Sequence, residues 1–296
     1  MKILLVSTLY TLFCLAGTKS INPDRTVRYL FELYDGYTRY TNGTVKVKGL
    51  GFNPISEEYS EKAQSYYMET SEFDYFHNLG LSTFEATPGD DYNSFGTAFH
   101  VGGNFLLTNQ HVLSTKRDNT TQCKRFQIKL NYDQYKLRVQ CKQVHYCDRE
   151  RDFCLIEMHE YPRGQSLSDK KGYTINPDIA YDDTALTTII GNSRGFGLHA
   201  SQGSGRSYID EDSFRFYAPV FGGNSGGPIF NEKDEVIGIV KQQSALLYGE
   251  RAYNVGISIK EVLRVLEENL EDQSILDQLN IKKDEPVLDI IRSAQD

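Results

Sequence analysis

A glycine-rich stretch, GGNSGGP at residues 222–228, constrains the fold of this chain most tightly, because segments that read as strands flank it at residues 214–217 and 229–230. Glycine on both sides of Ser225 permits backbone conformations that a Cβ atom would forbid. In such a loop the N–H groups of Gly223 and Ser225 can point at one spot beside the Ser225 hydroxyl, as an oxyanion hole requires. A glycine-rich hairpin turn without a catalytic role is the alternative.

Two further motifs precede this stretch. Residues 96–112 (GTAFHVGGNFLLTNQHV) predict a strand, a Gly-Gly turn and a second strand that leads to His111. Residues 150–158 (ERDFCLIEM) place Asp152 at the start of an apolar strand. The order His111, Asp152, Ser225 in these surroundings resembles the chymotrypsin-fold serine peptidases, whose motifs are similar to T-[AN]-x-H, D-[IF]-A-L-[IL] and G-[DN]-S-G-[GS]-P.

The resemblance covers about residues 80–270 and implies both a fold and an activity. The implied fold is all-β, with two six-stranded antiparallel β-barrels of chymotrypsin type and a C-terminal helix. The implied activity is that of a serine endopeptidase acting on proteins or peptides. Ser225 would be the nucleophile, His111 the general base and acid, and Asp152 the residue that orients the histidine. The amides of Gly223 and Ser225 would form the oxyanion hole.

Other residues compete for some of these roles. Asp148 is an alternative to Asp152, which is favoured because residues 153–156 continue from it as the strand of the family does. His199 is a candidate to line the substrate cleft. No pair of histidines has metal-ligand spacing with a matching Glu or Cys, so we expect neither a metal nor another cofactor. A protease-like binding protein that has lost turnover is the rival functional hypothesis.

The resemblance is closest to the secreted bacterial glutamyl-endopeptidase-like branch, but the residues that bind an acidic side chain there are changed. Val220 and Phe221 stand where that branch has a threonine before the Gly-Gly pair, and Val240 stands where it has a histidine. Lys241 is the remaining group that could reach a substrate carboxylate. We therefore expect these four residues to line the specificity pocket without conferring glutamyl specificity.

Composition excludes some classes of partner. The 296-residue chain carries a net charge of −8 and shows no basic cluster, so we expect no nucleic-acid partner. The chain has 20 Tyr, 16 Phe and 24 Gly, with many short alternating runs, which favours an all-β protein. We expect a monomer.

Residues 1–20 have the pattern of a secretory signal peptide. Lys2 supplies the basic start and residues 3–16 the apolar region, which is too short to span a membrane comfortably. No other segment is apolar enough to span one, so we expect no membrane anchor and a secreted or periplasmic location.

An even number of cysteines follows the signal, namely Cys123, Cys141, Cys147 and Cys154. An even count in an exported protein predicts two disulfides, and free buried thiols are the alternative. Residues 126–130 and 135–139 alternate as the halves of a hairpin whose register sets Cys123 opposite Cys141. Cys147 and Cys154 would then close a short loop that carries Asp152.

The remaining segments follow in order along the chain. The expected divisions are a signal peptide (1–20), an N-terminal extension or pro-segment (21–75), a peptidase domain (76–271, with barrels at about 77–161 and 185–259) and a helical tail (272–296). Within the extension, alternation predicts strands near residues 27–33 and 44–47 and a short helix at 57–68. Ser258 and Glu261 have the spacing of a capping box that would begin the C-terminal helix.

Overall fold

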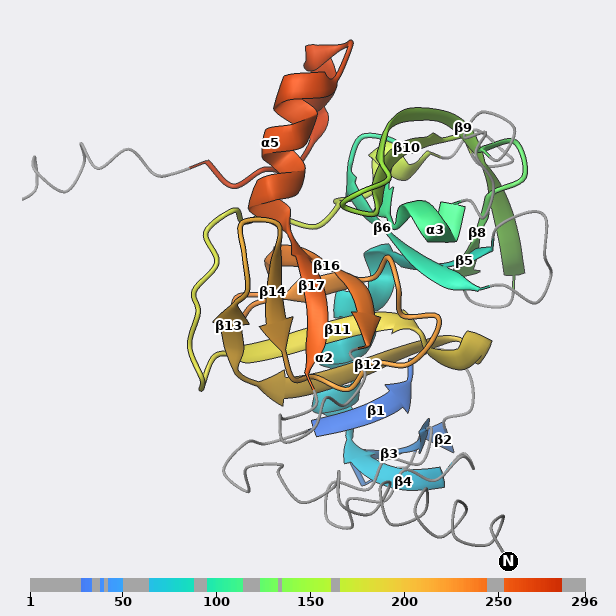
Figure 1. Cartoon of the computed structure of the whole chain (residues 1–296). Coiled ribbons are helices and arrows are strands. Elements are labelled where there is room, and N and C mark those ends of the chain that lie inside the picture. Colours follow the sequence, from blue (N-terminus) through green and yellow to red (C-terminus); the bar gives the residue numbers. More distant parts are fainter. Residues whose placement is uncertain are drawn as a thin grey trace, which may run out of the picture.

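The computed structural model describes residues 28–33, 38–39, 42–49, 64–87, 95–113, 123–132, 135–160, 166–243 and 253–283. Two β units make up most of this structure, with an α-helix packed at one end (Figure 1). The expected signal peptide at residues 1–20 lies outside the described residues. Within the described residues, no helix is both long and apolar enough to cross a lipid bilayer.

The first unit is a closed six-stranded antiparallel barrel with the strand order β10-β7-β6-β5-β8-β9. Its strands are β5 (Thr83–Thr87), β6 (Gly96–Gly102), β7 (Phe105–Thr108), β8 (Gln127–Tyr132), β9 (Tyr135–Asp148) and β10 (Phe153–Met158). In the β8–β9 hairpin, Ile128 pairs with Val139 and Leu130 with Leu137, as the alternation predicts. Ile128, Leu130 and Val139 are buried, because the period-two pattern turns one face of each strand inward. The expected first barrel is confirmed.

The second unit is an 11-stranded sheet to which both halves of the chain contribute. Its C-terminal strands are β11 (Leu186–Asn192), β12 (Leu198–Ser204), β13 (Arg206–Tyr208), β14 (Ser213–Phe216), β15 (Pro228–Phe230), β16 (Val236–Gln243) and β17 (Asn254–Ser258). These strands occupy the region expected for the second barrel, residues 185–259, and the two-part β fold is consistent with the chymotrypsin type.

Four N-terminal strands extend this second sheet at the edge of β12 (Figure 1). They are β1 (Arg28–Glu32), β2 (Thr38–Arg39), β3 (Thr44–Gly49) and β4 (Gln64–Glu69). Phe31 of β1 pairs with Ala200, and the Leu33 N–H donates to the Leu198 carbonyl at 2.9 Å. The expected N-terminal extension is thus built into the sheet of the second unit.

The described end of the expected helix at residues 57–68 is a strand instead, so this prediction is wrong there. Residues 64–69 form β4, in which Met68 pairs with Val45 and is buried with it. The segment is rich in tyrosine, which favours a pleated, half-buried surface over a helix. The helix of this region begins only after the strand, as α2 (Thr70–Leu79), followed by the 3₁₀ turn η1 (Gly80–Ser82).

One hydrophobic cluster joins the two units and the N-terminal segment. Its buried members include Leu33 and Val45 from the N-terminal strands, Phe99 from the barrel, and Leu198 and Phe230 from the second sheet. A separate cluster fills the first barrel, and a third lies within the second sheet. The shared cluster stabilises the contact between the units, because buried apolar area is removed from water only while they remain together.

Helix α5 (Ile259–Asn269) packs on the second sheet, as the apolar stripe predicts. Its expected capping box is wrong, since the Ser258 side chain makes no cap hydrogen bond. The Glu261 carboxylate is held by arginines instead, with Arg151 Nε at 3.0 Å and Arg264 Nε at 2.8 Å. A carboxylate bound by two guanidinium groups is not free to reach back to the N-cap.

The described part of the C-terminal tail returns to the junction between the units. After the 3₁₀ segment η4 (Gln273–Gln278), the Asn280 N–H donates to the Val101 carbonyl and the Lys282 N–H to the Ile175 carbonyl, each at 2.8 Å. Residues 284–296 lie outside the described residues. Three shorter elements complete the fold: α3 (Gln110–Leu113), η2 (Leu167–Asp169) and η3 (Ser193–Gly195).

Candidate active site

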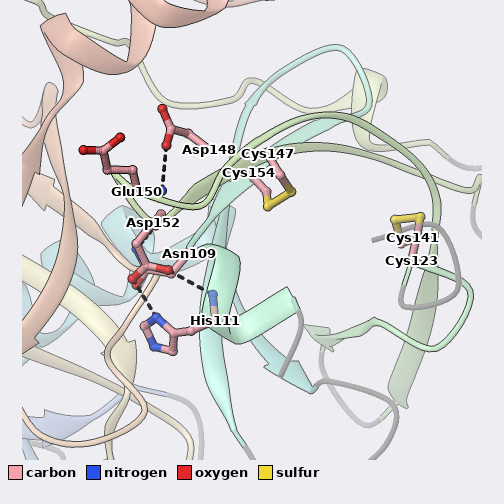
Figure 2. Close-up of a disulfide and its surroundings, with 9 residues drawn as sticks. All are labelled: Asn109, His111, Cys123, Cys141, Cys147, Asp148, Glu150, Asp152 and Cys154. Carbon is pink, nitrogen blue, oxygen red and sulfur yellow. Dashed lines mark hydrogen bonds and ion pairs between the residues drawn. A yellow bond between two sulfur atoms is a disulfide. The ribbon is translucent and has the colours of Figure 1, made fainter. Parts of the chain in front are cut away.

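His111 and Asp152 meet because their strands are paired. His111 lies on α3 directly after β7, and Asp152 directly precedes β10, which is antiparallel to β7. The His111 Nδ1 atom lies 2.7 Å from Asp152 Oδ2, and the His111 backbone N–H donates to Asp152 Oδ1 at 2.9 Å (Figure 2). Both carboxylate oxygens are therefore bound by the same histidine, which fixes the plane of the imidazole ring relative to the carboxylate.

The backbone of Asp152 adopts an uncommon conformation, with φ at +67°. Aspartate tolerates this left-handed region better than most residues with a Cβ atom. The buried side chain of Asn109 donates from Nδ2 to the Asp152 carbonyl at 2.8 Å. Asn109 thus holds the peptide that carries the carboxylate, and it stands two residues before the histidine in the T-N-Q-H motif.

Asp148, the competing carboxylate, is engaged elsewhere. Its Oδ1 accepts from the N–H groups of Glu150 and Arg151, each at 2.9 Å, and its Oδ2 lies 3.1 Å from Arg151 Nη1. Figure 2 shows Asp148 on the far side of the loop from His111. The structure therefore brings Asp152, not Asp148, to His111.

The structure forms the two disulfides that the hairpin register favours, Cys123–Cys141 and Cys147–Cys154 (Figure 2). The second joins β9 to β10 at directly paired residues, at the base of the loop that ends in Asp152. This bond limits how far the two strands can separate where the carboxylate is presented.

Ser225 lies in the turn before β15, and the first barrel holds that turn in place. The Thr97 N–H of β6 donates to the Ser225 carbonyl at 2.9 Å, and Thr97 Oγ1 donates to the Gly223 carbonyl at 2.7 Å. Gly226 (φ +81°) must be glycine, because a Cβ atom there would lie 2.2 Å from the Thr97 carbonyl oxygen. The serine turn therefore sits directly against the strand that leads to the histidine.

The Ser225 hydroxyl is half-buried and donates to the Lys241 carbonyl at 3.4 Å. Among the hydrogen bonds of the described residues, none joins Ser225 to His111. Catalytic hydrogen bonds of this kind often become short and aligned only when substrate binds. The side chain of His111 is half exposed, at 50%.

The amides of Gly223 and Ser225 have no hydrogen-bond partner within the described residues, whereas those of Asn224, Gly226 and Gly227 are bonded. The Gly222 carbonyl accepts from the Arg194 N–H at 2.6 Å. In a planar trans peptide the C=O and the following N–H point in opposite directions, so this bond turns the Gly223 N–H away from Arg194. Gly223 takes φ +97°, and a Cβ atom there would lie 2.2 Å from the Asn192 carbonyl oxygen.

The four expected pocket residues lie around this turn. Val220 and Val240 are buried in the cluster within the second sheet, with Val240 fully inaccessible. Phe221 is buried, and the Arg194 guanidinium lies over its ring, 4.9 Å from the centroid. Lys241 is half-buried, and its carbonyl accepts the hydrogen bond from Ser225.

His199 does not line an accessible cleft. It is 2% exposed, pairs with Glu32 of β1, and its Nδ1 donates to the Gly197 carbonyl at 2.8 Å. Burial lowers the pKa of His199 to about 4, the hydrogen bond to Gly197 opposes this shift, and the charge of Lys48 adds to it. His199 therefore folds as a neutral side chain at the junction with the N-terminal strands.

We expect this histidine to make stability pH-dependent. Between an unfolded pKa of about 6.5 and the folded value, only the unfolded chain binds the proton, so stability falls as pH falls through this window. The full loss is on the order of 3 kcal/mol. Urea unfolding at several pH values should show a shallower dependence for His199→Gln than for the parent. The exposed-site control His159→Gln should match the parent, and an unchanged slope in His199→Gln would contradict the prediction.

Sequence reasoning missed several residues that hold the site. The sequence motif could have identified Asn109, because T-[AN]-x-H admits an asparagine at its position. No sequence pattern identifies Thr97, Arg194 and Arg151, since their contacts join segments that lie far apart in the chain. No three His, Cys, Asp or Glu side chains among the described residues gather as a metal site would require.

Comparison with known proteins agrees with this geometry. A family model described as a trypsin-like peptidase domain matches residues 96–239. The glutamyl endopeptidase of Staphylococcus aureus strain MW2 is 26% identical over 185 residues, covering 58% of this chain and 53% of its own. That of strain MRSA252 is 26% identical over 187 residues, covering 58% of this chain and 48% of its own. The chain thus spans about half the length of the curated relatives it matches.

Among solved structures, the serine endoprotease from Yersinia pestis aligns with a TM-score of 0.49 at 16% identity, over 64% of this chain and 62% of its own. The matched region contains all three residues of the ordered motifs, His111, Asp152 and Ser225. Residues 96–239 are therefore a trypsin-like peptidase domain, and the chain has the fold of the chymotrypsin-type serine peptidases.

Proposed function

We propose that this chain is a secreted serine endopeptidase that hydrolyses peptide bonds through an acyl-enzyme intermediate. One observation carries the proposal. Residues 96–239 hold a histidine bound at 2.7 Å to a carboxylate and a half-buried serine, and the amides of that serine and of Gly223 have no partner among the described residues. These are the base, the orienting acid and the oxyanion donors that acyl transfer requires.

The residues of the site have defined tasks in the proposed reaction. Ser225 Oγ attacks the scissile carbonyl while His111 takes its proton, and the Gly223 and Ser225 amides stabilise the negative oxygen that develops. His111 then gives the proton to the leaving amine, and an acyl-serine ester remains. A water molecule, deprotonated by His111, then attacks the ester carbonyl, and His111 returns the proton to Ser225 Oγ as the bond to the acyl group breaks and the acid product leaves. Asp152 holds the ring and stabilises the imidazolium in both halves of the cycle.

Two features support an extracellular or periplasmic location. The described residues contain two disulfides, which persist in oxidising compartments and are rare in the cytosol of most organisms. Residues 1–20 have the pattern of a secretory signal. A monomer acting on protein substrates without a cofactor remains our expectation.

Labelling with a fluorophosphonate probe tests the proposed function most directly. An activated serine reacts covalently with such a probe, so we expect one label per chain on Ser225 together with casein hydrolysis. The rival hypothesis, a protease-like binding protein without turnover, predicts a folded chain that neither labels nor cleaves. That outcome would overturn the proposal.

Cleavage after glutamate should not dominate the specificity of this chain, although the matched relatives are named glutamyl endopeptidases. Val220, Phe221 and Val240 offer no partner to a substrate carboxylate, and burying an unpaired charge is costly. Profiling on a peptide library should show no strong preference for Glu before the cleaved bond. A strong preference that Lys241→Met abolishes would contradict this prediction and assign the recognition to Lys241.

A further inference from the structure

The guanidinium of Arg151 connects three elements that are distant in sequence. Its Nη1 lies 3.1 Å from Asp148 Oδ2, in its own loop. Its Nε lies 3.1 Å from Asp212 Oδ1, in the turn before β14, and 3.0 Å from Glu261 Oε1, on α5. The loop that ends in Asp152 belongs to the first barrel, whereas Asp212 and Glu261 belong to the second unit. Arg151 therefore joins the two units at the residue next to the catalytic carboxylate.

Two of the three partners of Arg151 are shielded from water, whereas the third, Asp212, is 47% exposed. The side chains of Glu261 and Asp148 are 7% and 9% exposed, and that of Arg151 is 25% exposed. Ion pairs with this degree of burial are screened less than surface pairs, and a carboxylate that loses its partner there keeps its desolvation cost. A hydrogen bond from Arg264 lowers the pKa of Glu261, so this carboxylate stays charged.

Because Arg151 directly precedes Asp152, the contacts that hold Arg151 also restrict the backbone of Asp152. The Arg151 N–H is bound by Asp148 Oδ1, and the next residue must take the left-handed conformation at φ +67°. Asn109 holds the carbonyl on the other side of Asp152. The carboxylate is thus presented to His111 from a turn whose two ends are fixed, one by Asn109 and one by Arg151.

We propose that Arg151 is a positioning residue that makes the His111–Asp152 pair depend on the docking of α5 and the Asp212 turn onto the first barrel. This inference rests on the proposed function for its effect on rate, but the hydrogen bond between His111 and Asp152 reports it independently. Separation of the units would release Arg151 and, through it, the turn that presents the carboxylate.

Arg151→Met in the full chain tests the proposal, because methionine keeps much of the apolar stem and removes the charge. We expect kcat for peptide hydrolysis to fall on the order of 100-fold, the scale of a small misplacement of a catalytic group, with a smaller change in KM. We also expect loss or broadening of the downfield proton resonance of the His111 Nδ1–H bound to Asp152. His111→Ala assigns that resonance in the parent.

Lys129→Met is the matched control, since it removes a partly buried ion pair of the same barrel, 2.7 Å from Glu85, away from the loop. It should keep both the resonance and kcat. Arg151→Lys keeps the charge without the planar fork and should recover part of kcat. A folded Arg151→Met that is only less stable, with the parental resonance and kcat, would overturn the proposal.

A second variant keeps the test decisive if Arg151→Met does not fold. Glu261→Gln removes the charge of the anchor on α5 and leaves the Asp148 and Asp212 contacts, so it should weaken the same resonance and lower kcat to a lesser degree. An unaltered resonance in Glu261→Gln would overturn the proposal.

If the parent neither labels nor hydrolyses, the proposed function fails, while the comparison of resonances still decides the role of Arg151.

Discussion

Ser225→Ala is expected to lower the rate of peptide hydrolysis by a factor on the order of 10⁶, the scale at which a serine nucleophile contributes together with its base. The Ser225 hydroxyl oxygen is the atom that would form the acyl ester. The substitution removes one half-buried oxygen whose hydrogen bond, to Lys241, is long at 3.4 Å. Folding should therefore change little.

The measurement is casein hydrolysis together with fluorophosphonate labelling of the purified proteins. Ser207→Ala, on β13 and also half-buried, is the matched control and should keep full activity and labelling. Thermal unfolding of both variants should follow the parent. If Ser225→Ala cleaved casein as fast as the parent, Ser225 would not be the nucleophile, and the assignment of His111 as its base would lose its basis.

Removal of the N-terminal strands is expected to prevent folding of the rest of the chain. A chain that begins at residue 80 lacks six buried apolar side chains of the shared cluster: Leu33, Val45, Val47, Met68, Phe73 and Phe76. Each contributes about 1.5–3 kcal/mol on burial, so together they contribute about 9–18 kcal/mol as an upper estimate. That range is as large as the whole stability of a typical domain, about 5–15 kcal/mol.

Comparison of chains that begin at residues 21 and 80 checks this prediction by circular dichroism and thermal unfolding. The longer chain should unfold cooperatively, and the shorter should lack a cooperative transition and probe labelling. A shorter chain that folds, labels and cleaves would instead identify the segment as a removable pro-segment. The loss would also expose the edge of β12, where the Leu198 carbonyl now accepts from Leu33.

Local patterns in the sequence predicted the parts of the fold that depend on neighbouring residues. Alternation predicted the β8–β9 hairpin, and the expected Cys123–Cys141 disulfide forms, although the Cys141 N–H bonds to the Phe126 carbonyl and Cys123 lies before β8. The apolar stripe of α5 predicted its buried face. The order of His111, Asp152 and Ser225 carried the resemblance, although only the pairing of β7 with β10 brings the His111 and Asp152 side chains together.

The features that escaped prediction depend on partners far away in the chain. Residues 64–69 form a strand because β3 is available to pair with them, which their own periodicity does not show. Glu261 has the spacing of a capping box, but Arg151, 110 residues earlier, and Arg264 bind its carboxylate. A propensity or a spacing describes one segment only. Which strand or side chain that segment finally binds is decided by the tertiary structure.

Both ends of the described chain enter the same core, and this imposes an order on folding. Leu33 and Leu279 belong to the cluster that joins the two units, and the strand β1 pairs with β12 across more than 160 residues. The shared core therefore cannot be completed until residue 279 has been synthesised, however early the first barrel closes. Contacts of such long sequence separation slow folding, because the chain loses conformational entropy in closing large loops before these contacts can form. The contact that holds the Ser225 turn against the first barrel is thus fully supported only after residue 279 has joined the shared core.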